Sequence, residues 1–105
     1  MADTGDNAGA IEQYREVLNS KPGYVAAHTA LAKLLAKTGD REGALAEYRE
    51  ASKQDQNPEI LEQMGDLEAA ANRSAEARTA YESALKQAPD RAARKRINNK
   101  LKSLK

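Results

Sequence analysis

The sequence predicts an all-α fold, a right-handed α-solenoid of about six helices arranged as antiparallel hairpins. A tyrosine recurs at a fixed stride, since Tyr14, Tyr48 and Tyr81 are 34 and 33 residues apart. The same spacing relates Ala10, Ala44 and Ala77, and also Val17, Ala51 and Ala84. The chain has no Phe and no Trp, and its hydrophobic fraction of 40% comes mostly from small and aliphatic residues. Such residues suit close helix packing better than a β-sandwich.

Three helices are predicted in the first half of the chain, at residues 7–20, 24–37 and about 41–53, because each range has apolar residues at helical spacing. The inward sets are Ala10, Ile11, Tyr14, Val17 and Leu18, then Val25, Ala27, His28, Ala30, Leu31, Leu34 and Leu35, then Ala44, Leu45, Tyr48 and Ala51. The connections are short, so consecutive helices should be antiparallel neighbours.

Tight turns are predicted at the same stride, at Gly5-Asp6, Gly39-Asp40 and Asn72-Arg73. Gly39 is expected to end a helix, since glycine adopts the left-handed backbone of a C-cap without a steric penalty. Asp40 is expected to cap the next helix, because a short polar side chain accepts the free amide hydrogens of the first turn. Asp6 or Asn7 would have this role in the first helix.

Three more helices are predicted in the second half. Asn57 and Pro58 open the first of them, since proline in the first turn removes an amide that has no partner there. Ser74 is expected to cap a helix at about 75–87. The last helix should span about 91–103. The large apolar residues of this last helix are Ile97, Leu101 and Leu104, which form one narrow stripe.

Composition excludes several classes of protein. The length of 105 residues suits a single domain over 1–105, and the absence of cysteine excludes disulfides, Cys-ligated zinc and thiol catalysis. No apolar run approaches a membrane span, and the first six residues do not resemble a signal peptide. We therefore expect a soluble protein. The compartment stays open, with the cytoplasm favoured over the periplasm.

Charge is distributed unevenly along the chain. Residues 1–90 hold all 16 acidic residues and 10 of the 17 basic ones, a net charge of −6. Residues 91–105 have a net charge of +7, from Arg91, Arg94, Lys95, Arg96, Lys100, Lys102 and Lys105. This basic end predicts a capping helix with a solvated charged face. Two alternatives are contact with nucleic acid or an anionic membrane, and electrostatic self-association. The absence of interleaved aromatic residues argues against nucleic acid.

Residues 7–91 resemble the tetratricopeptide repeat (TPR) family. The matching positions are Leu31-Ala32, Ala44, Tyr48 and Ala51 in one repeat, and Met64-Gly65, Ala77, Tyr81, Ala84 and Pro89 in the next. The resemblance implies full repeats at 25–57 and 58–91, a preceding half repeat at 7–22 and a basic capping helix at 92–105. Gly65 and Ala32 should allow neighbouring helices to approach closely. The half repeat lacks a first helix, which favours a fragment of a larger TPR protein over a half repeat whose exposed face is otherwise covered.

The resemblance also implies a function, namely a protein–protein interaction scaffold whose concave groove binds a peptide or helix of a partner. The expected groove residues are Thr29, Lys33, Lys37, Glu59, Glu62, Gln63 and Asp66. Their acids favour a neutral or basic partner segment, although an ordinary solvated helix face is the alternative. Glu59 and Gln63 replace the cations of a carboxylate clamp. A second functional alternative is an oligomerisation module that uses the exposed face of the half repeat.

Nothing in the chain predicts an enzyme, a cofactor or a small-molecule substrate. His28, the single histidine, has no accompanying nucleophile and orienting acid in sequence, and we expect it to be a partly buried filler between helices. Glu59, Glu62 and Asp66 share one helix face. However, no second acidic helix or histidine joins them, so we expect no metal site.

Overall fold

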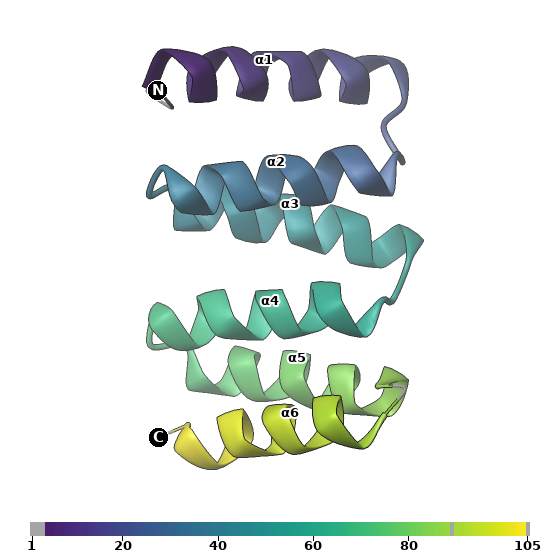
Figure 1. Cartoon of the computed structure of the whole chain (residues 1–105), viewed down its shortest axis with the longest axis vertical. Coiled ribbons are helices and arrows are strands. Elements are labelled where there is room, and N and C mark those ends of the chain that lie inside the picture. Colours follow the sequence, from purple (N-terminus) through teal and green to yellow (C-terminus); the bar gives the residue numbers. More distant parts are fainter. Residues whose placement is uncertain (1–3, 89, 105) are drawn as a thin grey trace. The chain divides into compact units, whose positions relative to one another are not determined.

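The computed structural model describes residues 4–88 and 90–104. Within this part the chain forms six helices packed in hairpins, which confirms the all-α prediction (Figure 1). The helices are α1 (Thr4–Ser20), α2 (Val25–Lys37), α3 (Arg41–Gln54), α4 (Pro58–Ala70), α5 (Ser74–Gln87) and α6 (Arg91–Ser103). Pro89 and Lys105, which the sequence analysis invoked, lie outside the described residues.

The chain divides into two compact units, Met1–Asp55 and Gln56–Lys105. The first unit contains α1, α2 and α3. The second contains α4, α5 and α6. Within each unit one antiparallel pair packs most extensively, α2 with α3 and α4 with α5 (Figure 1).

The core of the first unit lies between α2 and α3. Its buried apolar residues are Ala27, Leu31, Ala32, Leu35, Ala44, Leu45, Tyr48 and Ala51. His28 is also buried, at 7% exposed, and it is hydrogen-bonded at both ring nitrogens. Its Nε2 donates to the carbonyl oxygen of Pro22 at 2.6 Å, and its Nδ1 lies 2.8 Å from Glu47 Oε1. His28 thus joins the α1–α2 turn to α3, a structural role that agrees with the packing prediction.

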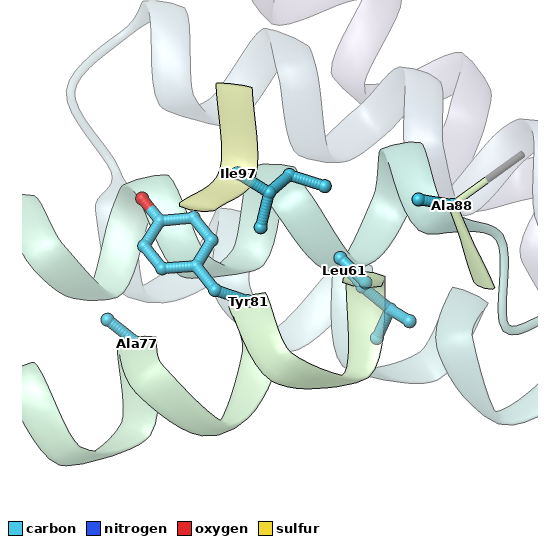
Figure 2. Close-up of a cluster of buried hydrophobic side chains, with 6 residues drawn as sticks. Leu61, Ala77, Tyr81, Ala88 and Ile97 are labelled. Atoms are coloured by element: carbon cyan, nitrogen blue, oxygen red, sulfur yellow. The ribbon is translucent and has the colours of Figure 1, made fainter. Parts of the chain in front are cut away.

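The core of the second unit joins all three of its helices. Figure 2 shows Leu61 of α4, Tyr81 of α5 and Ile97 of α6 in one apolar cluster. The helices α4 and α5 approach closely at Gly65, where an added Cβ atom would lie only 2.6 Å from Tyr81 Cε1. Because real Cβ atoms essentially never come so close, the position requires glycine. The predicted close approach at Gly65 is therefore confirmed.

Three of the predicted local signals have the expected geometry. Asp40 caps α3, since its Oδ1 accepts the Gly43 amide at 2.9 Å. Asn57 caps α4, since its Oδ1 accepts the Glu59 amide at 2.8 Å. Gly39 has a φ of +98°, a conformation that other residues rarely adopt.

Two predicted helix starts are wrong. Gly5 and Asp6 lie within α1, which begins at Thr4, so the predicted turn is not there. Glycine adopts helical and left-handed backbone conformations alike, so Gly5 by itself does not require a turn. Among the described residues, no helix precedes Gly5, so no reversal of the chain is needed there. Ser74 is the first residue of α5 and makes no cap, because the reversal occurs earlier, at Asn72 with a φ of 62°. Asparagine tolerates this conformation better than most residues.

Candidate functional site

The predicted groove residues of α2 form a polar stripe with a spacing of four residues. Lys33 and Lys37 are exposed, and Thr29 is half-buried. The Thr29 hydroxyl donates to the Ala26 carbonyl of its own helix at 3.1 Å. Two cations of this stripe are therefore available to a ligand.

The predicted groove residues of α4 differ in exposure. Glu59 is exposed, whereas Gln63 and Asp66 are half-buried. Glu62 is buried at 5% exposed. This burial was not expected for a groove residue, and it results from contact with α6.

Glu62 and Asp66 form a charge cluster with Arg96 and Lys100 of α6. Arg96 binds Glu62 in a bidentate manner, with Nε at 2.7 Å from Oε2 and Nη2 at 2.8 Å from Oε1. Lys100 Nζ donates to Glu62 Oε2 at 2.6 Å and lies 3.0 Å from Asp66 Oδ1. Bidentate charge-assisted hydrogen bonds are among the stronger polar contacts in proteins. The cluster therefore fixes the rotation of α6 against α4.

Tyr81 links this charge cluster to the apolar core. Its hydroxyl donates to Asp66 Oδ1 at 2.6 Å, while its ring contacts Gly65. Burial raises the pKa of Tyr81, and the hydrogen bond to Asp66 raises it further. Tyr81 thus remains a neutral donor that orients the Asp66 carboxylate.

The charge cluster strongly favours the ionised form of Glu62. The hydrogen bond from Arg96 is the main reason that the pKa of Glu62 falls to about 2, and Lys100 adds to it against the opposing effect of burial. For Lys100, burial lowers the pKa, but the hydrogen bonds to Glu62 and Asp66 outweigh it and the net pKa is raised.

We expect acid to weaken the attachment of α6. The pKa of Glu62 is below its ordinary value of 4.5 in the folded state, so its contribution to stability is complete above about pH 4.5 and is lost as the pH falls towards 2. Thermal unfolding measured across this range should show a steeper loss of stability in the native protein than in Glu62→Gln. Because other carboxylates titrate in both proteins, the difference between the two curves isolates Glu62. Parallel curves would contradict the assignment.

The charge cluster follows the repeat stride, a signal that the sequence analysis did not use. Glu62 and Arg96 are 34 residues apart, as are Asp66 and Lys100. Residues about one stride apart occupy nearly equivalent places on successive first helices, so opposite charges at this spacing predict a contact. The sequence analysis assigned the acids to a groove and the cations to a cap, and did not pair them.

The remaining surface features carry less chemistry. Val17 is 39% exposed and Tyr24 is 49% exposed, and they are large apolar side chains at the surface. In residues 4–88 and 90–104, no three His, Asp or Glu side chains are placed to hold a metal ion. No helix in this part of the chain has the length and apolar character needed to cross a membrane.

Consecutive helical hairpins with small residues at their close approaches define a helical repeat protein. The sequence profile of the tetratricopeptide repeat-like domain matches residues 1–105, so the chain belongs to this family. The fold is similar to that of a thermophilic TPR protein of Thermus thermophilus, with a TM-score of 0.75 and 27% sequence identity. That match covers 96% of this chain and 55% of the other, so the chain spans about half of its length. No curated protein matches the chain at a significant level.

Proposed function

We propose that this chain is a protein-interaction module that binds a peptide or helix of a partner protein through polar helix faces, that of α2 in the first unit and that of α4 in the second. The contact residues are Thr29, Lys33 and Lys37 of α2, and Glu59, Gln63 and Asp66 of α4. Glu62, expected in the same groove, is buried and held by Arg96 and Lys100 of α6. The preferred partner segment is neutral or basic. Proteins of this repeat family generally serve as interaction scaffolds, which supports the class of function.

The observation that carries the proposal is the charge cluster. In it, the polar face of α4 holds a helix that presents two cations four residues apart, Arg96 and Lys100. This contact is an example, within the chain itself, of carboxylates on α4 binding cations carried on a helix, and it already pairs Glu62 and Asp66. Glu59 is exposed beside this contact and remains available to a partner cation.

A small cleft next to the charge cluster supports the same assignment. It has a volume of about 360 Å³ and lies between the start of α4 and α6. Glu59 lines one part of it beside the Glu62–Arg96 ion pair, and the half-buried Pro58 and Ala93 contribute apolar surface. An aliphatic side chain that ends in a cation fits this combination, because its stem can lie on apolar surface while its charge meets a carboxylate.

The test uses residues that do not hold the molecule together. Photo-crosslinking from Gln63 in a cell extract identifies the partner, with the same crosslinker at the exposed Glu82 of α5 as a control. The affinity of that partner is then measured for Glu59→Lys and for Glu82→Lys. We expect Glu59→Lys to weaken binding by about tenfold, since like charges oppose a basic segment. Equal affinities of the two variants would contradict the proposal.

A further inference from the structure

The helix α6 has three distinct faces, and only two of them are used within the second unit. One face carries Ile97 into the core, and Leu101 packs partly buried against it. A second face carries Arg96 and Lys100 to the acids of α4. The third face is exposed, and we call it the outer basic stripe, consisting of Arg91, Arg94, Lys95, Asn98 and Lys102.

The repeat register shows what the outer basic stripe replaces. The helices α4 and α6 each have 13 residues, and they begin 33 residues apart. Arg94, Asn98 and Lys102 therefore stand where α4 has Leu61, Gly65 and Ala69. In α4 these positions contact the apolar cluster or the ring of Tyr81. The equivalent face of α6 thus has the position of a helix-binding surface, but its side chains are large and polar.

The polar residues at these three positions of α6 exclude an apolar helix as the binding partner of this face. Asn98 adds a side chain at the place where even a Cβ on Gly65 would collide with a packed tyrosine. Covering Arg94 and Lys102 with apolar side chains would remove two charges from water without a partner, which is costly. An occupant of this face must therefore bring anionic groups.

The charges of the stripe are not satisfied within the described part of the chain. Arg91, Arg94, Lys95 and Lys102 are exposed, and the ion pairs between α6 and the other described residues are formed by Arg96 and Lys100 instead. No acidic residue occurs between residues 91 and 104. The stripe lines a shallow depression of about 580 Å³, to which Asn98 and Asn99 contribute carboxamides that can donate hydrogen bonds. Asp90 also lines this depression at the start of α6, where its carboxylate accepts the Ala93 amide as a helix cap.

We propose that the outer basic stripe is a second docking surface, which binds an acidic helical segment of a partner protein. Charge complementarity selects carboxylates, and the row of cations along one helix face fits a helix with an acid on every turn. The exposed stripe has no large apolar residue to enter a membrane and no aromatic residue to stack on bases. The proposal is independent of the proposed function, because the stripe shares no residue with the faces of α2 and α4.

The experiment titrates the full chain with a helical peptide that has glutamate at every fourth position. The test variant is Arg94→Gln/Lys95→Gln/Lys102→Gln. The control variant is Arg41→Gln/Arg78→Gln/Lys86→Gln, which removes the same number of charges from exposed positions outside α6. We expect the test variant to lose about tenfold or more in affinity and the control variant to bind like the native protein. Both variants should unfold at the temperature of the native protein.

Two further probes distinguish the other polyanions. Duplex DNA and vesicles containing phosphatidylserine are titrated under the same conditions as the glutamate peptide and a glutamine version of it. Tighter binding of the glutamate peptide than of these three probes supports the proposal. Tighter binding of the DNA or the vesicles overturns it, as does an equal loss of affinity in the test and control variants. Absence of measurable peptide binding to the native protein also overturns it.

Discussion

Replacing Tyr81 with alanine is expected to lower the free energy of unfolding of the second unit by about 3–5 kcal/mol, the usual cost of truncating a buried aromatic side chain. Tyr81 is 2% exposed and its ring fills the space opposite Gly65. The substitution also removes the donor to Asp66 Oδ1 and so frees that carboxylate to move. Chemical denaturation followed by far-UV circular dichroism measures the loss. A change below about 1 kcal/mol would contradict the packing described here, because it would be typical of a surface substitution.

Gly65 provides a matched control for this result. In the native protein Gly65→Ala should destabilise, because the added Cβ would lie 2.6 Å from Tyr81 Cε1. In a Tyr81→Leu background the collision with the ring is removed. There the same change should stabilise α4 by up to about 1 kcal/mol, since alanine favours a helix more than glycine does. If Gly65→Ala destabilises the native protein but stabilises the Tyr81→Leu variant, the destabilisation comes from the collision with the Tyr81 ring and not from position 65 in general.

Replacing Ile97 with alanine is expected to cost about 2–5 kcal/mol and to release α6 from the α4–α5 hairpin. Ile97 is fully buried, with 0% of its surface exposed. Among the described residues of α6 it is the only buried one. Hydrogen exchange should show amides of α6 losing protection before those of α4 and α5. We expect the charge cluster alone not to retain the helix, since Arg96 is 54% exposed and solvent screens its attraction to Glu62.

Leu45→Ala is the comparison variant for Ile97→Ala. Leu45 is also 0% exposed, but it lies in α3 of the first unit. Its truncation should lower stability by a similar amount without selective loss of protection in α6. Equal protection of α6 in the two variants would contradict the assignment of Ile97 as the anchor of that helix.

The fold could be predicted because several local signals agree. The repeat stride, the inward alanines and the tyrosines require the same hairpins, and Asp40, Asn57 and Gly39 place helix ends at the same positions. Where the signal was a single permissive residue, the prediction failed. Gly5 could adopt a turn or a helix, and only the surrounding structure decides between them.

The surroundings of the proposed partner-binding residues were less predictable from the sequence. A glutamate on the polar side of a helix is most often solvated, so Glu62 was placed in an open groove. Its burial depends on Arg96, which lies far along the chain and binds through a bidentate geometry. Helical periodicity describes one helix at a time and therefore carries no information on such pairs. Only charge compared across the stride could have revealed the contact.

The register of α6 also bears on how arrays of this kind change their length. Because α6 begins 33 residues after α4, it is a first helix whose partner-facing positions have been altered. Arg94→Leu and Asn98→Gly would restore the residues that α4 has at those places. Two side chains on this face of α6 therefore decide whether a further helix could pack against it as α5 packs against α4.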